Sequence, residues 1–243
     1  MVNRSHPLPL YYQLMQELRH RIEGGEWEPG TQIPSERELS ETYGISRMTV
    51  RQALAELAES GLLRRDQGRG TFVAEPRMRR QITRLTSFTE DMRARGKRAS
   101  ARVLRLELAS ARPSVAHALQ LEAGERVVLV ERLRLAEGEP VAVECSHLHF
   151  PGCEGLIHED LSGSLYRLLQ ERFGIIPTRA REEVEAAACE PYEAQLLGIR
   201  RGEPVLQLRR RTLDQNLHPF EYVESVYRAD RYIVSLDLVA EET

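Results

Sequence analysis

The sequence is poor in the residues that build disulfide frameworks, metal centres and membrane spans. Its 243 residues include three cysteines, none in a CxxC pair, and its seven histidines form no cluster with the spacing of metal ligands. It has no apolar run of about 18 residues, and its first residues lack the apolar core of a signal peptide. These absences predict a cytoplasmic protein with no membrane span, no structural metal and no disulfide.

Lysine is almost absent, and the overall charge is slightly negative. Of the 34 basic residues all but Lys97 are arginine, and the net charge is -3. A chain with this charge is not an indiscriminate nucleic-acid binder, so any DNA binding must come from the local placement of arginines. Hydrophobic residues make up 41%, which is enough for packed cores, and the length predicts one large domain or two of ordinary size.

The first 75 residues have the pattern of three helices followed by a β-hairpin. Ser35 and Glu38 form a capping box at the start of the second helix, and Ser46 begins the third. The predicted elements are helices over 9–23, 35–43 and from 46 onward, and a hairpin over 62–73 with its turn at 66–70.

Three helices and a hairpin form a recurring DNA-binding arrangement, in which the third helix enters the major groove. Arg47, Thr49 and Arg51 lie on the third helix, away from its apolar stripe. An arginine can donate two hydrogen bonds to guanine, which is worth about 1–3 kcal/mol of discrimination. On an arbitrary helix such arginines are more often solvated surface charges. Further candidates for DNA contacts are Arg37, Gly68 and Arg69.

The combination of these motifs resembles the GntR family of transcription regulators. The resemblance spans about 65 residues with matching spacings, through the segments 9–13, 34–40, 43–54, 61–63 and 68–73. It implies a winged helix-turn-helix that binds operator DNA. The contacts it implies come from Arg37, Arg47, Thr49, Arg51 and Gly68.

The rest of the chain predicts a linker over 76–84 and an α+β domain over 85–243. Strands are expected at 101–109, 127–135, 141–149, 179–187, 205–213 and 221–228, with helices at 87–95, 114–120, 164–173 and 191–197. Residues 119–127 resemble residues 197–205, so this domain is expected to consist of two related halves around an antiparallel sheet. Such halves often leave a ligand cleft between them.

Several features of this domain favour an anion pocket. The segment Thr86-Ser87-Phe88-Thr89 opens a helix, whose free amides and hydroxyls bind anions readily, although plain helix capping is an alternative. Arg132 and Arg134 are two residues apart on a strand and therefore share a face. Ser164 opens another helix, where capping is again the alternative.

The position of Glu144 relative to the two arginines depends on the turn of a hairpin. A two-residue turn at Glu137-Gly138 would set Arg132 opposite Val143. A three-residue loop would set Arg132 opposite Glu144, and this is the register that we predict.

The second domain resembles the effector domain of the HutC subfamily, called UTRA. The matching segments are 85–92, 131–134, 139–144, 164–166, 219–222 and 225–232. The resemblance implies a chorismate-lyase-like fold, homodimers and a non-catalytic pocket. The most similar branch regulates amino-sugar use and binds N-acetylglucosamine-6-phosphate or glucosamine-6-phosphate. That branch implies phosphate contacts from Thr86, Ser87, Phe88, Thr89, Arg132, Arg134, Ser164 and Tyr166, and sugar contacts from Glu144, Glu221 and Tyr227. Other members of the subfamily sense urocanate, other sugar phosphates, phosphonates or fatty acids.

Two other classes of function are alternatives to an effector-controlled repressor. A lyase-like enzyme would need catalytic groups, but the sequence has no Ser-His-Asp order and no dinucleotide-binding glycine fingerprint, so we expect neither catalytic residues nor a cofactor. His147 and His149 alternate on one strand without an evident third metal ligand. An architectural DNA-binding protein without an effector would not bury an arginine pair beside a carboxylate.

Overall fold

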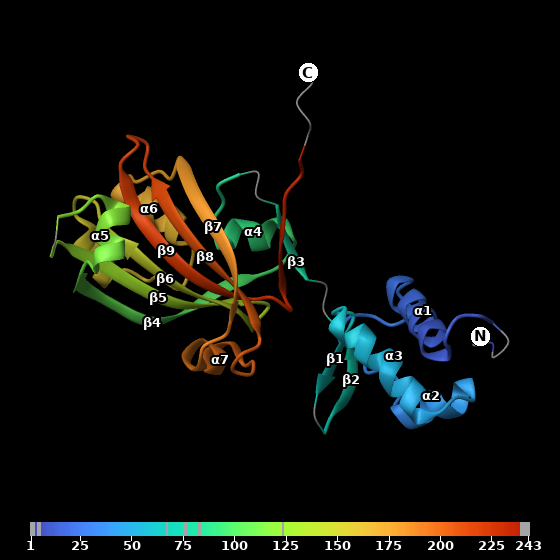
Figure 1. Cartoon of the computed structure of the whole chain (residues 1–243). Coiled ribbons are helices and arrows are strands. Elements are labelled where there is room, and N and C mark those ends of the chain that lie inside the picture. Colours follow the sequence, from blue (N-terminus) through green and yellow to red (C-terminus); the bar gives the residue numbers. More distant parts are fainter. Residues whose placement is uncertain are drawn as a thin grey trace, which may run out of the picture. The chain divides into compact units, whose positions relative to one another are not determined.

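The computed structural model describes residue 3 and residues 6–66, 68–74, 77–81, 84–122 and 124–238. The chain divides into two compact units, Met1–Arg77 and Met78–Thr243. The first unit is mainly helical, and the second is built around a sheet (Figure 1). This α+β arrangement is the one expected from the sequence.

The first unit consists of three helices and a hairpin. They are α1 (Leu10–Glu23), α2 (Glu36–Tyr43), α3 (Arg47–Glu59), β1 (Leu63–Asp66) and β2 (Gly70–Val73). The predicted capping box at Ser35 and Glu38 is present, and Ser46 caps α3. Leu18, Leu39 and Leu54, one from each helix, are buried in a shared core. Gln67 of the predicted hairpin turn lies outside the described residues.

A six-stranded antiparallel sheet forms the centre of the second unit (Figure 1). Its strands are β4 (Ala99–Ser110), β5 (Arg126–Ala136), β6 (Glu139–Leu148), β7 (Arg179–Ala188), β8 (Pro204–Leu213) and β9 (Pro219–Arg228). Their order across the sheet is β4-β5-β6-β9-β8-β7. The sheet therefore consists of two three-stranded halves that meet where β6 pairs with β9, in agreement with the internal repeat.

Helices pack on both faces of this sheet. On one face, α6 (Leu165–Phe173) and the 3-10 helix η1 (Cys153–His158) pack against Val130 and Leu148. On the other face, α5 (Pro113–Leu119) packs against Val127, and α7 (Pro191–Leu197) packs against Leu133. Because side chains alternate along a strand, Arg132 and Arg134 share the face of Val130. Their guanidinium groups thus lie on the side of the sheet that α6 covers.

Residues 78–81, which fall within the linker predicted over 76–84, form a strand. This strand, β3 (Met78–Gln81), pairs in parallel with β10 (Tyr232–Ser235). Met78 is buried beside α4 (Phe88–Ala94). The strand escaped prediction because it is short and rich in arginine, and because its partner lies far along the chain. Residues 76, 82 and 83 of the predicted linker lie outside the described residues.

The β5–β6 hairpin has the predicted register, but the predicted loop is wrong. Arg132 does lie opposite Glu144. The connection is a two-residue turn at Glu137 and Gly138, with φ of 51° and 83°, which suits a type I′ turn. A β-bulge at Val141 supplies the extra residue that the three-residue loop was expected to provide, and it turns Glu144 to the arginine face.

Candidate functional site

The first turn of α3 presents polar side chains away from the core. Arg47 is exposed, and Arg51 keeps 55% of its side chain exposed. The Ser46 hydroxyl, which caps the helix, lies 2.9 Å from the Thr49 hydroxyl. All three predicted contact residues of α3 thus lie outside the buried stripe of Val50, Ala53, Leu54 and Leu57.

Arg51 is held in place by a carboxylate of the preceding helix. Its Nε and Nη2 donate to Glu36, with 2.8 Å between Nη2 and Oε2. Arg51 in turn lowers the pKa of Glu36. The carbonyl oxygen of Arg51 accepts a hydrogen bond of 3.1 Å from Arg65. These contacts orient a planar donor group at the start of α3, which is the requirement for two-bond recognition of a base.

The remaining predicted DNA contacts lie on α2 and at the hairpin tip. Arg37 is exposed and pairs with Glu41, one turn along α2, at 3.5 Å. Gly68 has a φ of 77°, a conformation that glycine adopts without strain. The Arg69 carbonyl accepts a hydrogen bond of 3.1 Å from Gln32, which ties the tip to the loop before α2. The Arg69 side chain is exposed.

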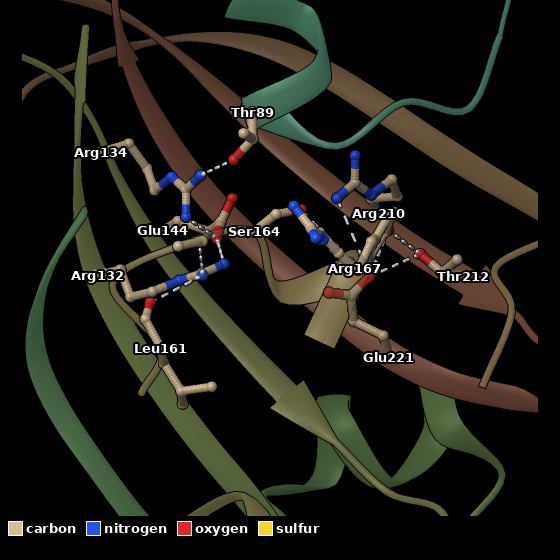
Figure 2. A network of polar contacts seen from close by, with 12 residues as sticks. Thr89, Arg132, Arg134, Glu144, Leu161, Ser164, Arg167, Arg210, Thr212 and Glu221 are labelled. Atoms are coloured by element: carbon tan, nitrogen blue, oxygen red, sulfur yellow. Dashed lines mark hydrogen bonds and ion pairs between the residues drawn. The ribbon is translucent and has the colours of Figure 1, made fainter. Parts of the chain in front are cut away.

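Arg132 and Arg134 lie beside Glu144 on the α6 face of the sheet (Figure 2). The two arginines are only 3% and 2% exposed. Arg132 donates to Glu144, whereas Nη1 of Arg134 is 4.0 Å from the same carboxylate oxygen. Nη2 of Arg134 donates to the Thr89 hydroxyl of α4 at 3.5 Å. One carboxylate therefore serves two buried guanidinium groups.

The charge balance at this cluster leaves Arg134 poorly compensated. Within the described part of the chain, its Nε and Nη1 have no hydrogen-bond acceptor. Burial, with Arg132 beside it, lowers the pKa of Arg134 to about 10. Burial alone would raise the pKa of Glu144, but the neighbouring arginines outweigh it and lower that pKa to about 2. A surplus of buried positive charge is the condition that favours an incoming anion.

A second polar cluster lies across the same face, around Arg210 and Glu221 (Figure 2). Glu221 accepts hydrogen bonds from the hydroxyls of Tyr166, at 2.7 Å, and Thr212, at 2.9 Å. Arg210 lies 4.0 Å from Glu221 and 3.7 Å from Glu182. Burial raises the pKa of Glu221, which Arg210 only partly offsets. Tyr166 and Glu221, to which the family resemblance gives separate ligand contacts, here bind each other.

A small pocket lies between these clusters and the start of α4. Its wall consists of Arg80, Thr86, Ser87, Phe88, Asp91, Glu144, Arg210, Tyr227 and Tyr232. Five of these nine residues are predicted effector contacts: Thr86, Ser87, Phe88, Glu144 and Tyr227. Of the other predicted residues, Arg132 and Arg134 lie beside Glu144 of this wall, Tyr166 and Glu221 belong to the cluster around Arg210, and Ser164 caps α6. Sequence reasoning missed Arg80, Asp91, Arg210 and Tyr232. Strand periodicity could have found Arg210, because it shares a face with the buried Leu208.

The depressed pKa of Glu144 predicts an acid-sensitive fold. The ordinary pKa of 4.5 falls to about 2 in the folded chain, so the ionised carboxylate stabilises the fold by about 3 kcal/mol. This contribution is complete above pH 4.5 and is lost as the pH falls through about 2. Glu144→Gln should lower the unfolding free energy at pH 7 and flatten its pH dependence in urea titrations between pH 5 and pH 2. Glu107→Gln, which removes an exposed carboxylate paired with Arg105, should change neither; an equal effect of both variants would contradict the assignment.

Among the residues described, no group of three or more histidine, cysteine, aspartate or glutamate side chains could hold a metal ion. His147 is buried, and burial together with Arg112 lowers its pKa to about 4. No helix in the described part of the chain is long and apolar enough to cross a membrane.

Comparison with known proteins agrees with both units. Residues 10–73 match the family described as bacterial regulatory proteins, gntR family, and residues 94–233 match the UTRA domain. The chain is 43% identical over 232 residues to the HTH-type transcriptional repressor NagR of Bacillus subtilis (strain 168), with 95% of each chain covered. It is 37% identical over 208 residues to the histidine utilization repressor of Pseudomonas putida, covering 85% of this chain and 83% of that protein.

A solved structure shares the fold over nearly the whole length. The crystal structure of PhnF from Mycobacterium smegmatis matches with a TM-score of 0.66 and 32% identity, covering 93% of this chain and 99% of that one. Members of this family bind operator DNA and small-molecule effectors. The chain therefore belongs to the GntR family, in the HutC branch with a UTRA domain, and is a DNA-binding transcriptional repressor rather than an enzyme.

Proposed function

We propose that this repressor is released from its operator by a small anion, namely glucosamine-6-phosphate or N-acetylglucosamine-6-phosphate. The observation that carries the proposal is the surplus of positive charge on the α6 face of the sheet. Among the described residues, four arginines of low exposure converge there on three carboxylates: Arg80, Arg132, Arg134 and Arg210 on Glu144, Glu182 and Glu221. The similarity to NagR supports an effector from amino-sugar metabolism.

The proposed effector contacts fall into two groups. The phosphate is bound by the start of α4, by the arginine pair and by the start of α6, through Thr86, Ser87, Phe88, Thr89, Arg132, Arg134, Ser164 and Tyr166. The sugar hydroxyls are bound by Glu144, Glu221 and Tyr227. This division matches the chemistry, since hydroxyls, amides and guanidinium groups suit phosphate, and carboxylates suit hydroxyl donors.

The proposed DNA contacts are those of the winged unit. Arg47, Thr49 and Arg51 contact base edges in the major groove, while Arg37, Gly68 and Arg69 contact the groove or phosphates. We further propose that the chain acts in the cytoplasm as a homodimer formed through the UTRA domain. Two α3 helices then engage half-sites about one helical turn apart. Effector binding at the start of α4 changes the path of the preceding segment, so that both half-sites cannot be held together.

Thermal unfolding against a ligand panel tests the proposed effector. A ligand at about 100 times its dissociation constant adds about 2.7 kcal/mol to the unfolding free energy, which should raise the unfolding temperature by several degrees. We expect this shift with the two amino-sugar phosphates and none with glucosamine, which lacks the phosphate. The panel also contains urocanate, other sugar phosphates, a phosphonate and a fatty acid. A shift only with one of these would discard the amino-sugar assignment.

A further inference from the structure

Arg80 occupies a position where the fold would ordinarily place an apolar side chain. Along β3, Arg79 is exposed, whereas Met78 and Arg80 are each only 6% exposed. Met78 packs into the cluster that contains Tyr227 and Tyr232. Burying a guanidinium group is costly unless it is paired and hydrogen-bonded. Its presence beside an apolar cluster therefore points to a function other than packing.

The resting partner of Arg80 is a carboxylate shared with a second arginine. Nη1 of Arg80 lies 3.0 Å from Glu182, on the edge strand β7. Arg210, which is directly opposite Glu182 in the β7–β8 register, lies 3.7 Å from the same carboxylate. A second carboxylate near Arg210 is Glu221, at 4.0 Å, which already accepts two hydrogen bonds from hydroxyls. Two guanidinium groups thus compete for Glu182.

Arg80 also forms part of the pocket wall, together with Arg210, Glu144 and the first residues of α4. An anion that enters the pocket therefore meets a guanidinium group whose carboxylate partner is shared with a second arginine. We propose that Arg80 is an effector-binding residue, which exchanges Glu182 for the anionic group of the ligand. The inference rests on the proposed function only in taking the ligand to be an anion.

The place of Arg80 in the chain gives this exchange a consequence for DNA binding. β3 is the first element of the second unit and follows the hairpin of the winged unit in sequence. Arg95 of α4 donates to the carbonyl oxygen of Arg79, so β3 and α4 are joined beside the pocket. When Arg80 changes partner, the strand that leads from the winged unit is held differently. Ligand binding thereby affects the winged unit through β3 as well as through α4.

Two substitutions at this ion pair are expected to change anion affinity in opposite directions. Arg80→Gln removes the cation, so the dissociation constants of inorganic phosphate and glucosamine-6-phosphate should rise at least tenfold. Glu182→Gln removes the competing carboxylate and leaves Arg80 free, so both constants should fall severalfold. Isothermal titration of the full-length chain measures these values, and operator release at saturating ligand provides a second readout, which Arg80→Gln should impair.

The opposite signs separate ligand binding from a purely structural ion pair. A structural pair would lower the unfolding temperature in both variants and leave anion affinity unchanged. Arg228→Gln serves as the matched control, because Arg228 is similarly buried and pairs with Asp230 away from the pocket wall. If only glucosamine-6-phosphate fails to bind the wild-type chain, the proposed effector is wrong but phosphate still tests Arg80. The inference is overturned if phosphate does not bind the wild-type chain, or if the wild-type chain and all three variants bind phosphate with equal affinity.

Discussion

Replacing Arg51 by alanine is expected to weaken operator binding by at least about 30-fold. One arginine with two bonds to guanine contributes about 1–3 kcal/mol, and the proposed dimer would lose two such contacts. The loss should be specific to sequence, because Glu36 orients the guanidinium group as a planar donor. Fluorescence anisotropy with a duplex selected from a random library measures the affinity, and the affinity for an unrelated duplex gives the background.

Two controls separate base recognition from the loss of charge. Arg51→Lys keeps the charge but not the planar fork, and should lose most of the same discrimination. Arg200→Ala removes an arginine that is 90% exposed in the second unit, and should leave operator affinity unchanged. Effector-induced thermal shifts should remain normal in every variant. Equal weakening on specific and unrelated DNA would reassign Arg51 to phosphate contacts, and loss of the thermal shift would argue against two separable modules.

Replacing Arg134 by methionine is expected to stabilise the free chain and to weaken its response to effector strongly. Burial and the neighbouring Arg132 lower the pKa of Arg134 to about 10, so its buried charge costs the folded state roughly 3 kcal/mol. Methionine fills similar space and keeps contact with the Phe88 ring, over which the guanidinium group lies at 4.6 Å. Unfolding free energy without ligand should therefore rise, and effector affinity should fall about 10- to 150-fold with the loss of a charged hydrogen bond.

The matched variant is Arg132→Met, on the same strand and face. Arg132 donates to Glu144, so its removal leaves a buried carboxylate without its main partner and should destabilise the chain. The two neighbouring arginines are thus expected to change stability in opposite directions, while both variants lose effector response and retain operator binding. Urea titration and effector titration of operator complexes check this. A normal effector response of Arg134→Met would remove this residue from the anion site.

Much of the fold was predictable because its signals are local. Capping boxes at Ser35 and Ser87 mark the starts of α2 and α4, and alternating apolar residues mark the six strands of the sheet. The pairing of Arg132 with Glu144 was predicted correctly, but from a wrong loop. A type I′ turn followed by a β-bulge places the same β6 side chains on the buried face as a three-residue loop would. The pattern of buried residues alone therefore cannot distinguish the two connections.

The site residues were predictable only where charged side chains occupy the apolar positions of a strand with clear alternation. Arg132 and Arg134 follow Val128 and Val130 on one face, and the two-residue spacing in the sequence indicates this shared face. Arg80 lies in a stretch rich in arginine, where no periodicity distinguishes the buried residue from its exposed neighbours. The partner of Arg80, Glu182, lies on β7 of the six-stranded sheet and 102 residues further along the chain, whereas β3 pairs with β10 in a separate sheet. No local sequence signal indicates that pairing. Contacts between distant strands depend on the topology of the fold, which cannot be inferred from composition and motif spacing.

The two halves of the sheet are related by an approximate twofold axis between β6 and β9. The internal repeat makes Arg132 on β5 equivalent to Arg210 on β8, and both lie on the α6 face. The symmetry is broken in their partners: Arg132 pairs toward the axis with Glu144, whereas Arg210 pairs toward the sheet edge with Glu182. A ligand at the proposed site would meet these two similar cations in different surroundings. The broken symmetry would therefore favour one orientation of an asymmetric effector over the reverse.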